Sequence, residues 1–346
     1  MDSITCPIHR SCLWNPPMDR TPGSPLSLSR RGLLRTGAGA GASLAALGLG
    51  LGAQTASAAV PATQRFELTE PSYDLFRSKN THGARVQQSF AFDWVNKFLF
   101  VATKRTGSSE SAGDLCINKM DFDGNYLSYM HLDGFGHGVA FAALPSGSGT
   151  ELWIECAANT GGYGTALAPI DYVGGTTLSS PAGSAAYRPI PGATEYTCSV
   201  DPVHQRMIVR YQSSGGKRIA VYPLSAFTTR DFGTPLVDFK QPAIPGTPQG
   251  YTLYGSYMYY LTGDAYPGNG TPTGDGNSYI TSIDINTGTV KQDPVLTKAG
   301  STLHHREPEG LAVYRTDAGE ARLFIGFATG VEGDRRSSIF YKKALV

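Results

Sequence analysis

One pattern of strands occurs five times between residues 88 and 313, and it constrains the fold more than any other feature. Each copy starts with a polar or aromatic residue that leads into a short apolar strand, and further strand-like segments follow. The starts are roughly 50–60 residues apart: Gln88–Phe92, His137–Phe141, Tyr196–Val200, Gln249–Leu253 and Glu309–Val313. Such a repeat of strands is typical of a β-propeller. The sequence therefore predicts an all-β, five-bladed β-propeller.

The last predicted blade is short, because the chain ends after three strands, Leu311–Tyr314, Arg322–Phe327 and Ser338–Lys342. We expect Arg65–Thr69 to supply its outer strand, so that strands from both ends of the chain close the ring and leave no unpaired blade. In the second blade, strands are predicted at Val139–Ala143, Glu151–Ala157 and Thr165–Tyr172, before a Gly174-Gly175 turn.

Residues 1–58 are predicted to be an export signal that is removed. Ser29–Arg35 contains a twin-arginine pair, the uncharged stretch Thr36–Ala53 follows it, and Ala56–Ala58 offers a cleavage site of small residues. The alternative is a membrane anchor, which the glycine and alanine content of the stretch disfavours. We therefore expect residues 59–346 to form a single propeller domain without a membrane span, secreted to the extracellular space in a folded state.

Charge and cysteine content exclude several classes of partner. The net charge is +1, and no basic block follows the signal, which argues against nucleic-acid binding. Cys116, Cys156 and Cys198 lack metal-ligand spacing and are expected to be buried apolar residues. Asp121–Asn125 resembles the start of a calcium loop, but turn chemistry explains it, as it does Asp284–Gly288 in another blade. We predict no cofactor and no metal site, with a structural Ca²⁺ as the open alternative, and a monomer.

The candidate site follows from propeller geometry, because the starts of all inner strands meet at the mouth of the central channel. Polar residues and tyrosines are concentrated there, and aromatic faces beside hydrogen-bonding groups suit sugar rings. The alternative is that these side chains tie neighbouring blades together. The catalytic candidates are His137, His305, Arg306, Tyr196 and Glu309, and the candidates for substrate binding are His82, Arg85, Gln88, Gln249, Tyr251, Glu307 and Tyr163.

The blade starts, the segment His305–Val313 and the segment Leu323–Phe327 resemble one group of bacterial and phage proteins. This group contains the β-propellers of teichoic acid biosynthesis protein C and of phage receptor-binding proteins, with helveticin-like proteins nearby. The likeness extends over about residues 65–346 and rests on the blade pattern. It implies contact with a cell-wall or extracellular polysaccharide. More distantly, the chain is similar to secreted propeller lyases that cleave rhamnose–glucuronate linkages.

Two functions of different classes follow from the residues and the resemblance. The first is a lyase that cleaves a uronate-containing glycan by β-elimination, with His137 or His305 as base, Tyr196 or Tyr251 as acid, and Arg306 or Arg85 on the carboxylate. A glycoside hydrolase is a variant in which Glu307 or Glu309 works with a carboxylate from another blade. The second is a propeller that binds glycan without cleaving it. The cluster of histidine, arginine and glutamate before the fifth blade favours an enzyme.

Overall fold

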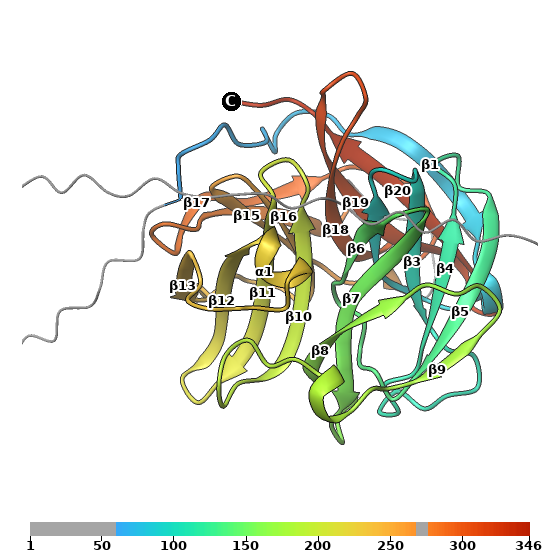
Figure 1. Cartoon of the computed structure of the whole chain (residues 1–346). Helices are drawn as coiled ribbons and strands as arrows, with labels where there is room; N and C mark the ends of the chain where they lie inside the picture. The colour runs from blue at the N-terminus through green and yellow to red at the C-terminus, as the bar shows by residue number, and fades with distance from the viewer. Residues whose placement is uncertain (1–59, 268–275) are drawn as a thin grey trace, which may run out of the picture. The chain divides into compact units, whose positions relative to one another are not determined.

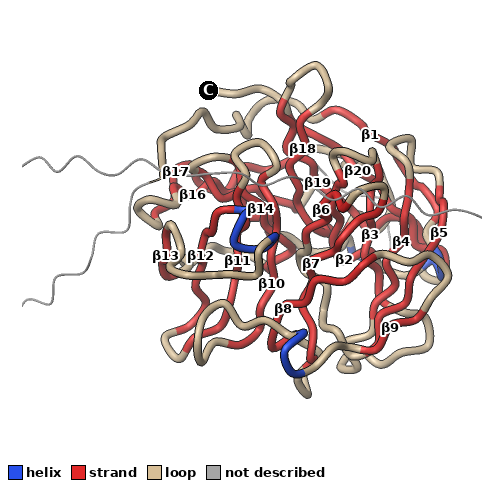
Figure 2. The backbone as a smooth tube through the Cα atoms, viewed as in Figure 1, coloured by secondary structure: helices blue, strands red, loops and turns tan. Residues whose placement is uncertain are grey.

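A computed structural model of the protein describes residues 60–267 and 276–346. Residues 1–53 and 54–346 separate into two units, and all described residues belong to the second. The predicted export signal lies outside the described residues. Within the described part, twenty strands form five sheets arranged as a closed propeller, and the only α-helix is α1, Leu224–Thr228 (Figures 1 and 2). Two short 3₁₀ turns, η1 (His82–Ala84) and η2 (Gly183–Ala185), complete the elements. The predicted five-bladed, all-β fold is confirmed.

Blade one has five strands and blade two has three, because the strand that follows blade two in the chain joins blade one. Blade one contains β2 (Gln87–Asp93), β3 (Phe98–Lys104), β4 (Leu115–Met120) and β5 (Tyr126–Asp133), and blade two contains β6 (Ala142–Ser146), β7 (Gly149–Ala158) and β8 (Gly164–Asp171). The segment after β8 does not add a regular outer strand to blade two. Instead β9 (Thr177–Ser179) pairs in parallel with β5 of blade one, and only Tyr187 bridges to β8. The inner strand of blade two also begins at Ala142, three residues later than the predicted Val139.

Blades three and four are regular four-stranded antiparallel sheets. Blade three contains β10 (Thr194–Asp201), β11 (Arg206–Ser213), β12 (Gly216–Pro223) and β13 (Val237–Lys240), with α1 between the last two strands. Blade four contains β14 (Pro248–Tyr254), β15 (Tyr257–Thr262), β16 (Ser278–Asp284) and β17 (Thr289–Thr297). Their second and third strands correspond to the strand-like segments of the sequence. Successive side chains of these strands point to opposite faces of the sheet, and each face packs against a neighbouring blade.

Blade five is closed by the N-terminal strand β1 (Tyr73–Asn80), which pairs with β20 (Asp334–Lys342) outside β19 (Ala321–Val331) and β18 (Glu307–Arg315). The closure by both ends of the chain was predicted, but the assignment of Arg65–Thr69 to it is wrong. That segment only bridges Phe66 to Leu345 beside the C-terminal residues. The true strand escapes notice in the sequence because only Phe76 of its eight residues is buried and two register irregularities break its alternation.

Five apolar clusters fill the five boundaries between neighbouring blades, which is the packing that a closed ring requires. Trp153 and Ile154 show how one strand serves two of them, because Trp153 packs against blade three and Ile154 against blade one. The boundary between blades five and one buries Phe76 of β1 with Phe92 and Phe324. Each blade is therefore held from both sides, and the strand starts at the mouth have a rigid support.

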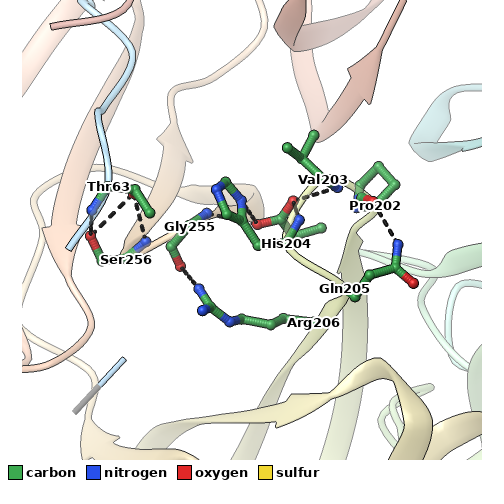
Figure 3. A network of polar contacts seen from close by, with 9 residues as sticks. Thr63, Pro202, Val203, His204, Gln205, Arg206, Gly255 and Ser256 are labelled. Carbon is green, nitrogen blue, oxygen red and sulfur yellow. Dashed lines mark hydrogen bonds and ion pairs between the residues drawn. The ribbon is translucent and has the colours of Figure 1, made fainter. Parts of the chain in front are cut away.

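Buried aspartates at the ends of two inner strands connect blade one to blade two and blade three to blade four. Asp93 is buried and accepts a hydrogen bond from Thr150 Oγ1 of blade two (2.6 Å), and Asp201 is buried and accepts one from the Gly255 amide of blade four (2.7 Å). Figure 3 shows the second network, in which Arg206 also donates to the Gly255 carbonyl oxygen (2.9 Å) and Ser256 contacts the N-terminal segment.

Cys116, Cys156 and Cys198 are buried and unpaired, as expected from their strand context. Burial raises the pKa of the Cys116 and Cys156 thiols to about 12, so both stay protonated. Within the described residues, no helix is long and apolar enough to cross a membrane.

Candidate functional site

A cavity of about 640 Å³ opens where the inner strands begin, and all five blades contribute to its wall. Its volume lies in the range of sites that hold small molecules or short oligosaccharides. Seven of the twelve predicted residues line it: Arg85, Gln88, His137, Tyr163, Gln249, Glu307 and Glu309. The closed ring therefore brings seven of the candidates to one cavity, although they lie up to 224 residues apart in the sequence.

Two tyrosines that the sequence placed in the site belong instead to the core. The side chain of Tyr196 packs between blades two and three, and its hydroxyl donates to the Ile190 carbonyl oxygen. Tyr251 is fully buried, and its hydroxyl pairs with Thr197 Oγ1 (2.8 Å). Burial raises the pKa of both phenols, so both stay protonated, and their hydroxyl groups are occupied by protein partners in the core. Neither lines the cavity.

His305 and Arg306 also lie outside the cavity wall. The Arg306 guanidinium group is buried beneath the surface, where it donates to the carbonyl oxygens of Ala299 (2.8 Å) and Thr297 (2.9 Å) and lies over the Phe327 ring. Because its donors are committed to the backbone, it supports the loop rather than a ligand carboxylate. His305 is nearly buried and reaches the site only through Glu307, at 3.0 Å between Nε2 and Oε2.

His82 lies on the outer side of blade one, away from the cavity. Its ring stacks on Tyr129 with 3.6 Å between centroids and also contacts His131. Its backbone amide is held by the side chain of Asn118 (2.6 Å). Arg85, three residues later in the same loop, does line the cavity. Only part of the polar segment before blade one therefore faces the channel mouth.

Five charged residues of the cavity were not among the predicted candidates: Lys104, Glu110, Glu195, Arg210 and Lys217. Glu195 directly precedes the predicted Tyr196, but its backbone is left-handed (φ 51°) and the strand pairing is irregular there, so Glu195 faces the cavity while Tyr196 enters the core. Lys104 ends an otherwise apolar second strand. Because Lys104 ends a second strand and does not start an inner one, the pattern of inner-strand starts does not identify it.

The wall from blades one and two combines a lysine, a histidine and an exposed tyrosine. Lys104 Nζ lies 3.2 Å from His137 Nδ1 and 3.8 Å from Glu110 Oε2. The His137 ring is parallel to that of Tyr163, with 5.2 Å between centroids, and Tyr163 is 42% exposed. Burial and the Lys104 charge lower the pKa of His137 to about 4, so its imidazole is neutral at physiological pH.

A buried glutamate beneath this wall fixes the loop that carries His137. Glu155 accepts hydrogen bonds from the amides of Gly138 (2.7 Å) and Gly164 (2.6 Å), one on each side of the wall. A side chain at Gly136 would collide with Glu155, since an added Cβ would lie 2.1 Å from its carboxylate. This arrangement explains why β6 begins late: the residues after His137 fold over Glu155 before they join the sheet. Burial raises the pKa of Glu155, and these amides oppose that rise.

The floor of the cavity is formed by Gln88 and Glu309 from the inner strands of blades one and five. Glu309 is 6% exposed, and its backbone oxygen accepts a hydrogen bond from the side chain of Gln87 (2.9 Å). Burial, followed by the nearby Glu307 carboxylate, raises the pKa of Glu309 well above its ordinary value, and Lys104 opposes this effect. The Gln88 amide donates to the Gln87 carbonyl oxygen (3.2 Å).

The opposite wall comes from blades three and four and is already paired. Lys217 contacts Glu195 in an ion pair, and Arg210 donates to Gln241 Oε1 (2.7 Å). Gln249 donates to the Gly263 carbonyl oxygen (2.9 Å). These contacts hold the side chains in place, so they present a preformed polar surface to a ligand.

No metal centre is assembled in the part of the chain that the structure describes: nowhere in it do three histidine, cysteine, aspartate or glutamate side chains cluster with the spacing of metal ligands. The cavity combines an exposed aromatic ring with neutral and charged hydrogen-bonding groups. Such a surface can bind a polyhydroxylated ligand, because the ring packs against C–H groups while the polar groups replace water around the hydroxyls.

Comparison with known proteins agrees with the fold. A family model described as the phage five-bladed beta propeller receptor binding platform domain matches residues 86–341. No curated protein matches the chain. Among solved structures, the tail fiber of Staphylococcus aureus phage P68 is similar with a TM-score of 0.63 and 16% identity, over 80% of this chain and 54% of the tail fiber. This chain thus spans about half the length of that protein.

Two glycoside hydrolase structures are less similar. The xyloglucan GH43B of Bacteroides ovatus gives a TM-score of 0.42 with 12% identity, over 76% of this chain and 53% of the hydrolase. The exo-beta-1,3-galactanase of Clostridium thermocellum gives a TM-score of 0.43 with 10% identity, over 78% of this chain and 63% of the galactanase.

Proposed function

Since the chain belongs to the family of phage five-bladed β-propeller receptor-binding platform domains, we propose that it binds an extracellular or cell-wall polysaccharide in the cavity at the channel mouth. The observation that carries this proposal is the exposed Tyr163 ring, held parallel to His137 at the edge of a polar cavity. Rings presented in this way form one side of sugar-binding sites, and the remaining hydrogen-bonding groups determine which sugar fits.

Glycan retention tests this proposal directly. Immobilised gum arabic, pectin and cell-wall teichoic acid serve as probes, and retention of the protein is compared with that of a Tyr163→Ala variant. We expect at least one glycan to retain the protein and the variant to lose that retention. A matched control is Tyr279→Ala, because Tyr279 is also exposed (39%) but does not line the cavity. Equal loss in both variants, or no retention of the parent protein, would contradict the proposal.

A second candidate is cleavage of a uronate-containing glycan by β-elimination. It is favoured by a neutral histidine and a buried glutamate of raised pKa that line the same cavity, since such perturbed groups are concentrated at catalytic sites. His137 would take the proton from the carbon next to the uronate carboxylate. The electron pair of that C–H bond would form a C=C bond as the C–O bond to the leaving sugar breaks. Glu309 would give its proton to that leaving oxygen, and Arg85 would hold the carboxylate.

The two candidates differ in what the glycan becomes. Elimination produces an unsaturated uronate, which absorbs ultraviolet light, and a new reducing end, whereas hydrolysis produces a reducing end without that absorbance. Binding alone produces neither signal. Loss of the absorbance signal in His137→Ala, with glycan retention kept, would assign His137 as the base. We further propose that the protein acts outside the cell as a monomer, after export through its twin-arginine signal.

A further inference from the structure

The floor of the cavity contains a carboxyl group without a protein partner. Among residues 60–267 and 276–346, none donates a hydrogen bond to the side chain of Glu309, although this residue is 94% buried and lines the cavity. The side-chain oxygen of Gln88 beside it likewise has no donor within the described part. Both side chains line the cavity, so these hydrogen-bonding positions are open to a ligand that enters it.

The charges around this floor select against a charged ligand group. Glu307 lies two residues away on the same strand, and Lys104 acts on Glu309 from β3, so carboxylate and ammonium charges both influence the floor. The neighbouring inner strands contribute the uncharged Gln88 and Gln249, and the other charged groups of the cavity are Arg85, Glu110, Glu195, Arg210 and Lys217. Because the surrounding charges are of both signs, neither an anion nor a cation meets a net opposite charge here, whereas an uncharged sugar avoids the cost of removing a charge from water.

We propose that Glu309 is a specificity-determining residue that, as an uncharged carboxylic acid, donates a hydrogen bond to an uncharged sugar residue bound at the cavity floor. A hydroxyl of that sugar accepts from Glu309, and a neighbouring hydroxyl donates to the side-chain oxygen of Gln88. This inference rests on the proposed glycan-binding function and adds to it the class of sugar: a neutral hexose or pentose unit, with any uronate or phosphate group outside the floor.

The protonation state has a consequence for pH dependence. Because burial and Glu307 raise the pKa of Glu309, the donor form is present below that raised pKa and is lost as the pH rises through it. Ionised Glu309 cannot donate, and it would add a second carboxylate next to Glu307. Glycan affinity should therefore fall on the alkaline side.

Three variants and two readouts test the inference. An array of oligosaccharides with neutral hexose, uronate, amino-sugar and phosphorylated ends is probed with the parent protein, Glu309→Gln, Glu309→Ala and the control Glu70→Gln, at an exposed glutamate that does not line the cavity. We expect the parent to bind best to neutral ends. Glu309→Gln, which keeps a neutral donor, should hold its affinity and lose the alkaline fall, whereas Glu309→Ala should bind about tenfold more weakly.

Infrared difference spectra of the parent minus Glu309→Gln provide the second readout, which needs no ligand. A protonated carboxyl band at neutral pH is expected to disappear in the variant. Absence of that band, preference for charged ends, or loss of binding in Glu309→Gln equal to that in Glu309→Ala would overturn the inference while glycan binding itself stands. If no glycan on the array or among the polysaccharides binds the parent protein, the proposed function fails and the inferred sugar fails with it, whatever the infrared band shows.

Discussion

The ammonium nitrogen of Lys104 lies 3.2 Å from Nδ1 of His137, across the boundary between blades one and two. The two residues are 33 apart in the sequence, and the contact exists because the end of β3 and the loop before β6 meet at the mouth. The positive charge of Lys104 at this distance disfavours a second positive charge on the imidazole, so the contact helps to keep His137 neutral.

We expect the pKa of His137 to rise when Lys104 is replaced by methionine, because the variant keeps the aliphatic volume and removes the charge. In the parent protein the pKa is about 4. Since this value is below that of an unfolded histidine, the residue destabilises the fold as the pH falls from about 6.5 toward 4, where the unfolded chain binds the proton first. Proton NMR titration of the His137 ring measures both values. A parent pKa near 6.5, or no change in the variant, would contradict the assignment.

Tyr163 should contribute to glycan affinity through its ring rather than its hydroxyl. Tyr163→Ala is expected to weaken binding by about 1–2 kcal/mol, roughly five- to thirtyfold, because it removes the stacking face. Tyr163→Phe keeps that face and should bind within about twofold of the parent. Isothermal titration calorimetry with a retained glycan compares the two variants. Equal loss in both would assign the effect to the hydroxyl group instead.

The closing strand should be decisive for stability, because β1 pairs with the edge of β20 that faces away from β19. Phe76→Ala is expected to lower the free energy of unfolding by about 3–5 kcal/mol, the usual cost of truncating a buried phenylalanine. Leu127→Ala serves as the control, since Leu127 is about half exposed on β5 and should change stability by less than about 0.5 kcal/mol. Chemical denaturation measures both. Equal stability of the two variants would mean that β1 is not essential to the ring.

Asp201→Ala should also destabilise the protein, by about 2–3 kcal/mol. The change leaves the Gly255 amide, together with the amides of Val203 and His204, without the carboxylate that accepts from them. Asp171→Ala, at an exposed position, is the matched control. We expect the midpoint temperature of thermal unfolding to decrease clearly for Asp201→Ala and to change little for Asp171→Ala. No decrease for Asp201→Ala would contradict its role as a connection between blades three and four.

Export provides a prediction about the N-terminal segment, which lies outside the described residues. Changing Arg30 and Arg31 together to lysine keeps the charge and should abolish secretion, because the twin-arginine route depends on the arginine pair itself. Immunoblots of cells and culture medium measure the distribution. Normal secretion of the double variant would show that another route is used.

The repeat of strand starts predicted the number of blades, and the short fifth blade predicted closure by both chain ends; the structure confirms both. It worked because each inner strand is buried and has a short apolar segment after a polar start, as the entirely buried β2 illustrates with Phe90–Phe92. It was misleading for the closing strand, where an edge position leaves six of eight residues polar or exposed and register irregularities remove the alternation.

The membership of the site depended on which way each side chain points, and local sequence does not specify this. At the start of blade three, Glu195 has a left-handed backbone (φ 51°) and faces the cavity, whereas the adjacent Tyr196 enters the core. The run before blade five shows the same ambiguity, because Arg306 turns inward to bind backbone carbonyls while Glu307 and Glu309 face the mouth. The amino-acid sequence determines the period of the repeat. At a strand start, however, a change in the backbone conformation of one residue decides whether a side chain faces the core or the cavity, and only packing against the neighbouring blades selects that conformation.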